Sequence, residues 1–288
     1  MPSLRAAAIL ATFLLVTFVC IPWQWASVRF HLKRRKTFPN RYHRFLCRLF
    51  GLKVIVRGQP IRDRGVLMAA NHTSYFDVLA FSSIVRVSFV AKSEVANWPL
   101  FGTLAKLQET VFVERTRRSQ TAEARDLIRE RLREGDALVL FPEGTSNDGN
   151  RVLPFKSALM GAAESEMETD GEGRVRYVPV QPVSISYVSL HGIPMGREYR
   201  PLFAWYGDMD LVPHLWEAVK TGPIEVIVEF HPPLTVDSAG GRKALAHAAE
   251  AIVRRGQARA LAGLVHADQP ATAQERDIDE TELAEAAA

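Results

Sequence analysis

The stretch GVLMAANHTSYFD, residues 65–77, decides how this chain folds. Its first half is a short apolar run of the kind that forms a buried strand, and its second half starts a helix with polar residues. Open α/β sheets hold their ligands at such turns, beyond the carboxyl ends of the strands. The stretch therefore predicts a strand over 65–70, a helix over 74–83 and a functional turn between them.

Short apolar runs continue to alternate with helical segments along the chain. Strands are expected at 53–56, 65–70, 87–91, 110–113, 137–141, 178–186 and 224–230, and helices at 74–83, 98–107, 118–133, 157–167 and 242–262. Near-continuous apolar strands separated by helices are typical of a sheet that is buried on both faces. The chain is therefore predicted to be α/β, with a mostly parallel or mixed sheet flanked by helices over residues 51–266.

Composition and charge distribution narrow the class of partner. The 288 residues are 47% hydrophobic and 24% charged, which suits one large globular domain or two small ones. Basic residues crowd into positions 29–48, whereas the last twenty residues are acidic. A basic stretch beside an apolar one indicates anionic lipid, and no nucleic-acid-binding module accompanies it. Residues 267–288 lack apolar periodicity and are predicted to be a disordered acidic tail.

The first fifty residues are predicted to be a membrane anchor. Residues 6–21 carry no charge, and with Trp23 and Trp25 the apolar span is just long enough to cross a bilayer. The basic flank follows the span, which predicts the inner (plasma) membrane with the rest of the chain in the cytoplasm. A secretory signal is disfavoured because only Arg5 precedes the apolar core.

A second apolar segment leaves the topology of this anchor open. Residues 38–52 mix Phe45, Leu46, Leu49 and Phe50 with Arg and His, a pattern typical of an interfacial amphipathic helix. The sequence allows either one membrane span or a re-entrant pair of helices.

The two cysteines carry no site of their own. Cys20 and Cys47 show no CxxC or Cys/His spacing, so the sequence indicates neither a zinc site nor a disulfide framework. A reducing compartment fits this usage, and neither a metal nor a redox cofactor is predicted.

His72 and Asp77 are the candidate catalytic pair. Positions five apart on a regular helix diverge by about 140°, so the two side chains meet only if His72 lies before the helix begins. The ring would then be exposed with a carboxylate to orient it, as a general base requires. The alternative is that Ser74 caps the helix with Asp77 as its partner and leaves His72 a bystander.

A second motif, FPEGTS at 141–146, follows another predicted strand. Pro142 stops strand pairing and Gly144 permits a tight turn, but a plain strand-to-helix turn capped by Thr145 and Ser146 explains the same residues. Lys156 lies at the expected start of the next helix, where a cation beside backbone N–H groups is a candidate phosphate ligand.

Taken together, these motifs resemble those of a known family. NHTSYFD and FPEGTS, in this order and about 65 residues apart, are similar to the first and third signature blocks of glycerolipid acyltransferases related to bacterial 1-acylglycerol-3-phosphate acyltransferase. Residues 111–115 resemble the second block, with Glu114 where Asp is more frequent, and residues 178–183 resemble the fourth. The stretch 91–102 also fits, so the resemblance covers roughly residues 50–190.

The resemblance implies a membrane-bound O-acyltransferase and assigns roles to particular residues. His72 would be the base and Asp77 its orienting partner, while Arg115, Glu143, Gly144 and Thr145 would bind the acceptor's polar head. Lys156 is added as a substrate-binding residue on local chemistry alone. The implied reaction moves a fatty-acyl group from acyl carrier protein or acyl-CoA to the free hydroxyl of 1-acylglycerol-3-phosphate and forms phosphatidate.

Other acceptors and other activities remain open at this point. Residues 191–197 and 205–210 resemble a branch of the family in ornithine-lipid synthesis, which makes lyso-ornithine lipid the alternative acceptor. Remoter alternatives are an acyl ester or thioester hydrolase and a non-catalytic lipid-binding protein. Asp208 and Asp210 form a conceivable metal pair, but a helix cap at Asp210 is the simpler interpretation.

The expected mechanism is direct transfer. The acceptor hydroxyl loses its proton to His72 as it attacks the thioester carbonyl, and Asp77 favours the imidazolium that forms. Backbone N–H groups near Ser74 are candidate donors to the tetrahedral oxyanion. No GxSxG nucleophile elbow occurs in the chain, so an acyl-enzyme is not expected.

Overall fold

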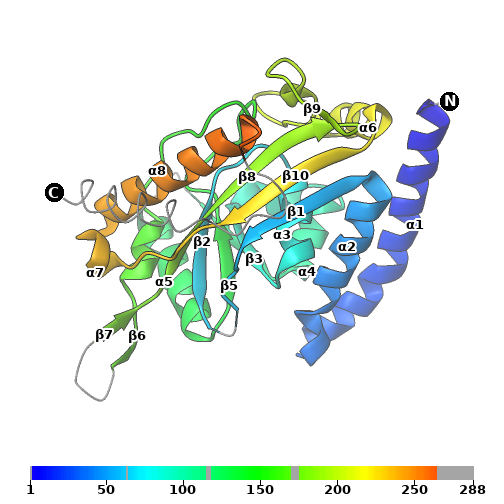
Figure 1. Ribbon diagram of the computed structural model, residues 1–288. Helices are drawn as coiled ribbons and strands as arrows, with labels where there is room; N and C mark the ends of the chain where they lie inside the picture. Colours follow the sequence, from blue (N-terminus) through cyan, green and yellow to red (C-terminus); the bar gives the residue numbers. More distant parts are fainter. Residues whose placement is uncertain (1, 63, 115–117, 170–174, 265–288) are drawn as a thin grey trace.

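A mixed β-sheet between two layers of helices organises the computed structural model, which describes residues 2–62, 64–114, 118–169 and 175–264 (Figure 1). The sheet order is β1–β10–β8–β2–β5–β3–β4, with β9 paired to the end of β8. The strands are β1 (Leu52–Gly58), β2 (Val66–Ala70), β3 (Ser88–Lys92), β4 (Val111–Val113), β5 (Ala137–Leu140), β8 (Val180–Leu190), β9 (Ile193–Pro194) and β10 (Ile224–Phe230). A separate antiparallel hairpin joins β6 (Glu166–Thr169) and β7 (Val175–Tyr177).

Parallel pairing dominates the centre of the sheet. Strand β2 is hydrogen-bonded in parallel to β5 on one side and to β8 on the other, and β3 pairs in parallel with β5 and β4. Strand β10 runs antiparallel to β8 and parallel to β1. The carboxyl ends of β2, β3, β4 and β5 therefore meet at one edge of the sheet, which is where the candidate residues lie.

Strand alternation divides the core between the two faces. Val66, Met68 and Ala70 of β2 belong to one apolar cluster, and Leu67 and Ala69 belong to the other. The first cluster is covered by α1 (Pro2–Arg29), α2 (Phe38–Phe50), α3 (Phe76–Ile84) and α6 (Leu211–Thr221). The second is covered by α5 (Arg118–Arg133) and α8 (Arg242–Leu261), with α7 (Val236–Ala239) at its margin. A strand buried on both faces explains why residues 66–70 are apolar without a break.

Helix α1 is attached to the folded domain at both of its ends. Near its start, Arg5 donates a hydrogen bond to the carbonyl of Val219 in α6 at 3.1 Å. Near its end, the buried amide of Gln24 donates to the carbonyls of Arg35 and Leu107, both at 2.9 Å. Arg35 lies in the short helix η1 (Lys33–Arg35), and Leu107 ends α4 (Phe101–Leu107).

The outward side of α1 is apolar. Its exposed large side chains are Leu4, Leu14, Leu15, Phe18, Val19, Trp23 and Trp25. By length and composition α1 is long and apolar enough to cross a membrane. This exposed apolar surface is compatible with membrane association.

Helix α2 forms where the sequence predicts it, but its apolar side faces inward. Leu46, Cys47 and Phe50 are buried in the core, and the Arg44 side chain donates to the carbonyl of Ser83 in α3 at 2.8 Å. The prediction of an interfacial helix was therefore wrong about this face, because α3 covers it. The boundary after residue 50 stays a prediction, and the predicted tail at 267–288 lies outside the described residues.

Most predicted elements are confirmed within a few residues, but one predicted helix is not formed and one observed helix was not predicted. The helix expected at 157–167 is instead a short 3₁₀-helix η3 (Met160–Glu164) followed by strand β6. Helix α6 was not among the expected helices, although Asp210 does occupy its N-cap position, without a side-chain cap bond. The remaining 3₁₀ turns are η2 (Ser93–Asn97) and η4 (Arg200–Leu202).

Candidate active site

Asn71 releases the chain from the sheet at the end of β2. Its buried side-chain amide donates to the carbonyl of Ile185 at 2.9 Å and accepts from the Ile185 N–H at 2.8 Å. These two bonds replace one step of the β2–β8 ladder with side-chain contacts. The main chain is therefore free to turn outward at His72 while remaining fixed to β8.

The loop after β5 holds the backbone of His72 on both sides. The His72 N–H donates to Oε1 of Glu143 at 3.3 Å, and the His72 carbonyl accepts from the Asn147 N–H at 3.2 Å. The Asn147 amide in turn donates to Oε2 of Glu143 at 2.7 Å. The FPEGTS motif and the histidine motif, far apart in sequence, thus form one hydrogen-bonded unit.

The imidazole of His72 has a fixed plane and a fixed partner. Its ring stacks on Phe141, with centroids 4.1 Å apart and planes 16° from parallel. Its Nδ1 lies 2.8 Å from Oδ2 of Asp77. Because an ionised carboxylate only accepts hydrogen bonds, Nδ1 carries the proton and Nε2 presents a lone pair. The side chain is 23% exposed, and Nε2 has no hydrogen-bond partner among the described residues.

Asp77 is fully buried and accepts hydrogen bonds at both oxygens. In addition to His72, Oδ2 accepts from the N–H groups of Thr73 at 2.8 Å and Ser74 at 3.0 Å. Oδ1 accepts from the hydroxyl of Tyr187 at 2.6 Å. The predicted contact between His72 and Asp77 is therefore present, and the same carboxylate accepts from two backbone N–H groups at the start of α3. The alternative cap is not formed, because the Ser74 hydroxyl has no hydrogen-bond partner among the described residues and Tyr75 occupies the N-cap position.

Tyr187 is a site residue that the sequence analysis missed. It lies on β8 and is buried, and burial together with the charge of Asp77 raises the pKa of its hydroxyl far above the ordinary value. The hydroxyl therefore stays protonated and donates to Asp77. Its position beside the motif depends on the pairing of β2 with β8, and no local pattern in the sequence reveals that pairing.

Glu143 lies beneath the histidine and is turned away from solvent. The residue is 2% exposed, and burial, with a smaller contribution from the charge of Asp77, raises the pKa of its carboxyl to about 8. Both oxygens contact groups of the protein itself, which favours a positioning role for Glu143 over contact with the acceptor. Gly144 has the positive φ of 79° that the tight turn requires, and Thr145 is exposed beside it.

Three further expectations need correction or lie outside the structure. The Thr73 and Ser74 amides are occupied by Asp77 and are not free to stabilise an oxyanion. Lys156 is exposed, but it does not begin a helix, because η3 starts only at Met160. Arg115 lies outside the described residues.

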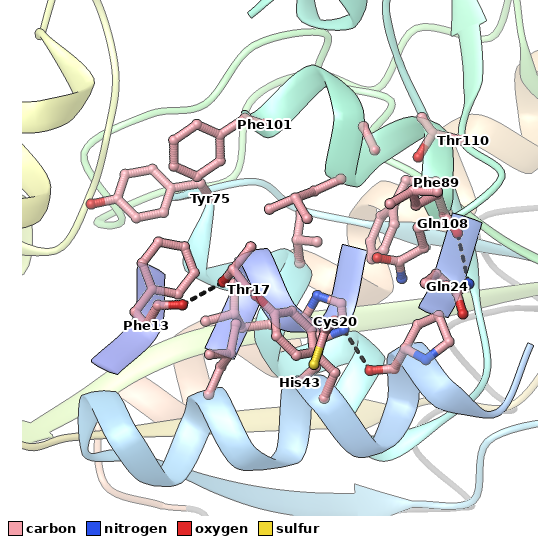
Figure 2. A pocket seen from close by; sticks show the side chains of 18 of the residues that line it. Phe13, Thr17, Cys20, Gln24, His43, Tyr75, Phe89, Phe101, Gln108 and Thr110 are labelled. Carbon is pink, nitrogen blue, oxygen red and sulfur yellow. Dashed lines mark hydrogen bonds between the residues drawn. The ribbon is translucent and has the colours of Figure 1, made fainter. Parts of the chain in front are cut away.

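An apolar cavity of about 220 Å³ opens beside the catalytic turn. Helices α1, α2, α3 and α4 and strand β3 supply its walls (Figure 2). Figure 2 shows Tyr75 and Phe101 at one end and Gln24, Gln108 and Thr110 at the other. Tyr75 belongs to the histidine motif, whereas Thr110 precedes β4, so the cavity runs from the carboxyl edge of the sheet towards its amino edge.

A stack of rings connects the histidine to this cavity. The Phe141 ring stacks on His72 and also lies nearly parallel to the Phe89 ring, with Phe141–Phe89 centroids 6.3 Å apart. Phe89 lines the cavity. Contacts between these rings therefore link the cavity to His72. Within the described part of the chain, no group of three His, Cys, Asp or Glu residues is arranged to hold a metal ion.

Comparisons with known proteins agree with this geometry. The family model described as Acyltransferase matches residues 53–186. The lyso-ornithine lipid O-acyltransferase of Brucella abortus is 44% identical over 252 residues, which cover 88% of this chain and 93% of that protein. The 1-acyl-sn-glycerol-3-phosphate acyltransferase of Neisseria gonorrhoeae is 32% identical over 60% of this chain and 62% of its own.

A solved structure has a similar fold over nearly the whole length. The crystal structure of the 1-acyl-sn-glycerophosphate acyltransferase PlsC from Thermotoga maritima matches with a TM-score of 0.62 and 25% identity. The match covers 92% of this chain and 98% of that one. The expected fold class is thereby confirmed.

Replacing Tyr187 with Phe is expected to lower turnover about tenfold while leaving the Michaelis constant of the acceptor nearly unchanged. The change removes one charge-assisted hydrogen bond to Asp77, worth roughly 1.5–3 kcal/mol, without touching the acceptor. Steady-state kinetics measure the two constants separately. Tyr177→Phe, on the β6–β7 hairpin, is the matched control, and an unchanged kcat in Tyr187→Phe would refute the positioning role.

Glu143→Gln is expected to remove a pH dependence of stability. Between its ordinary pKa of 4.5 and the folded value of about 8, the folded state holds a proton that the unfolded chain releases. The contribution of Glu143 to the free energy of unfolding is therefore complete below about pH 4.5 and is lost as the pH rises to about 8. The free energy of unfolding, measured with urea at several pH values between these limits, should fall for the native protein relative to the variant as the pH rises. The difference should change by at most about 1.4 kcal/mol per pH unit. Glu134→Gln, at an exposed position, is the control, and its free energy of unfolding should follow that of the native protein at every pH. The same parallel behaviour in Glu143→Gln would contradict the prediction.

Proposed function

The chain belongs to the acyltransferase family, and from that premise we propose that it is a membrane-bound lyso-ornithine lipid O-acyltransferase. The observation that carries the choice of acceptor is the extent of similarity. The Brucella protein matches over 93% of its length at 44% identity, whereas the Neisseria glycerol-phosphate enzyme matches over 62% at 32%. The 1-acylglycerol-3-phosphate acceptor expected from the motifs becomes the second candidate, favoured by the likeness to PlsC over 98% of that chain.

The proposed reaction begins with a hydroxyl bound at Nε2 of His72. The imidazole takes the hydroxyl proton as the oxygen attacks the thioester carbonyl, and Asp77 stabilises the imidazolium that results. The tetrahedral intermediate then expels the thiolate of the carrier, which accepts the proton from the imidazolium. The products are the acylated acceptor and the free thiol carrier. Nε2 of His72 takes and returns the same proton. Because the acceptor hydroxyl attacks the thioester directly, no covalent enzyme intermediate is required.

The apolar cavity supports a fatty-acyl substrate. Its lining consists almost wholly of apolar and aromatic side chains, and the Phe89–Phe141–His72 stack connects it to the reacting nitrogen. Burial of a hydrocarbon chain contributes about 0.8 kcal/mol per methylene group. The donor is proposed to be acyl carrier protein or acyl-CoA. Both are acidic, and Lys33, Arg34 and Arg41 of the basic segment suit either one.

The surroundings of Arg200 suit the binding of an anionic group of the acceptor. Its guanidinium donates to the Asn150 side chain at 2.8 Å and to the Met195 carbonyl at 3.1 Å. Burial and the neighbouring charge of Arg197 lower its pKa, against a smaller opposite effect of the Asp148 charge, and no salt bridge joins it to a carboxylate of the described residues. A bound carboxylate or phosphate would offset the free-energy cost of this partly desolvated charge. A methyl group built on Gly149 would meet both Thr73 and Cβ of Arg200, so the base of the Arg200 side chain lies near the turn that carries His72.

The proposed location is the cytoplasmic side of the inner membrane. The exposed apolar side of α1 and the basic residues that follow it support contact with anionic lipid. The acceptor is itself a membrane lipid, so an enzyme held at the bilayer meets it without extracting it into water.

Transfer of labelled acyl groups to two acceptors tests the proposed function. Purified protein in detergent, given labelled acyl carrier protein or acyl-CoA, is expected to label lyso-ornithine lipid and to lose all transfer in His72→Ala. Label on lysophosphatidate alone would overturn the proposed acceptor and retain the His72 chemistry. Release of free fatty acid at the same rate with no acceptor would instead identify a hydrolase, and transfer that survives in His72→Ala would refute the mechanism.

Arg200→Gln is expected to raise the Michaelis constant for the preferred acceptor about tenfold with little change in kcat. A tenfold change corresponds to about 1.4 kcal/mol, in the range of a hydrogen bond to a charged group. Arg200→Lys keeps the charge, so its Michaelis constant for the acceptor should lie between those of Arg200→Gln and the native protein. Equal Michaelis constants in all three proteins would exclude Arg200 from head-group binding.

A further inference from the structure

Four large apolar side chains are exposed together beside helix α6. They are Ile193 at 70%, Tyr199 at 56%, Leu202 at 43% and Val212 at 74% exposure. They come from β9, from η4 and the turn before it, and from the first turn of α6. This set, here called the β9–α6 flank, lies away from the apolar cavity, none of whose walls it forms.

The flank adjoins the exposed apolar side of α1. Helix α6 packs against α1 on one side and against η4 on the other. Arg5 fixes the start of α1 to the carboxyl end of α6. Figure 1 shows β9 and α6 beside the N-terminal end of α1. The flank therefore lies next to α1, whose exposed side chains include Leu4, Leu14 and Phe18.

The attachment of α1 limits how it meets a bilayer. Its first turns are fixed to α6, and Gln24 near its other end is fixed to the last residue of α4. A helix of 28 residues is about 42 Å long, comparable to the full thickness of a bilayer. Upright insertion would carry α4 and α6 into the hydrocarbon. An orientation in the plane of the interface exposes only the apolar side of α1 to lipid, and it places the β9–α6 flank at the same surface.

We propose that the β9–α6 flank is a second membrane-docking surface, which inserts into the lipid interface alongside α1. The occupant is the bilayer itself, because α6 packs against α1, and α1 carries the exposed apolar side chains and the length of a membrane-associated helix. Tyr199 suits the interfacial region, where aromatic side chains with a polar end gather. Arg197 lies beside this tyrosine and is exposed, in position to meet lipid head groups.

The flank is joined directly to the catalytic turn. After η4, the Trp205 N–H donates to the Thr73 carbonyl at 2.9 Å, and the Ser146 hydroxyl donates to the Trp205 carbonyl. The Tyr75 hydroxyl is hydrogen-bonded to Nδ1 of His214 in α6 at 2.8 Å. Docking of the flank would therefore set the height of His72 above the membrane and let a lipid acceptor approach sideways. This consequence rests on the proposed lipid acceptor, whereas the docking itself does not.

Site-directed fluorescence measures lipid contact without any acceptor. The full chain carrying Cys20→Ala is labelled with an environment-sensitive dye at Ile193→Cys or Val212→Cys, and Cys47 stays buried and unlabelled. Vesicles of phosphatidylethanolamine and phosphatidylglycerol are expected to blue-shift both probes, and brominated phospholipid is expected to quench them. Leu127→Cys on α5, which is 44% exposed, is the matched control and should show neither change.

Two outcomes would overturn the proposal. Probes at Ile193 and Val212 that behave like the control show that the flank stays in water. A blue shift that depends on protein concentration, without quenching by brominated lipid, assigns the flank to a second copy of the chain.

A kinetic arm tests the link to catalysis separately. The double substitution Ile193→Asp with Val212→Asp should raise the Michaelis constant for acceptor in vesicles about tenfold, but leave it unchanged for acceptor dispersed in detergent. Leu127→Asp should change neither. If the probes report lipid but these constants do not move, the docking stands and sideways entry of the acceptor is refuted. If no acceptor is acylated in either setting, the proposed function fails and the fluorescence result is unaffected.

Discussion

The buried carboxylate of Asp77 is the group on which the site depends. A charge removed from water is tolerated only when its oxygens are fully hydrogen-bonded, and here the donors are one imidazole, two backbone N–H groups and one tyrosine hydroxyl. Each donor comes from an element that must be in place first: the turn after β2, the start of α3, and β8. The same contacts that satisfy the charge fix the tautomer of His72, so stability of the turn and readiness for proton transfer have one physical origin.

A second constraint is the division of the sheet into two faces. The N-terminal helices cover one face and leave an apolar cavity between themselves and β3, while α5 and α8 close the other. The cavity ends near the histidine because Tyr75, one of its lining residues, belongs to the catalytic motif itself. An apolar chamber and a polar proton acceptor are normally incompatible neighbours. Here the Phe141 ring links them, because it stacks on the imidazole and lies nearly parallel to Phe89, which lines the cavity.

The helix that contacts lipid is also part of the enzyme's core. Ala6 and Phe13 of α1 are buried in the same apolar cluster as β2, and Gln24 ties the helix to α4. The exposed apolar surface of α1 and its contribution to the apolar cavity therefore lie on different sides of one helix, and Phe13, which is 5% exposed, belongs to the cavity side.

The sequence by itself determined the alternation of strands and helices, the His72–Asp77 pair and the membrane character of α1, because strand burial, motif spacing and charge-free length are local properties. It did not reveal Tyr187, the contacts of Glu143 with His72, or the inward face of α2. Those depend on which strands pair and on what covers each helix. The order β8–β2–β5 brings residues more than 100 positions apart into hydrogen-bond contact, as for Tyr187 and Asp77. Only the tertiary structure decides such contacts, because chain periodicity specifies which face of a strand is buried and not which strand lies beside it.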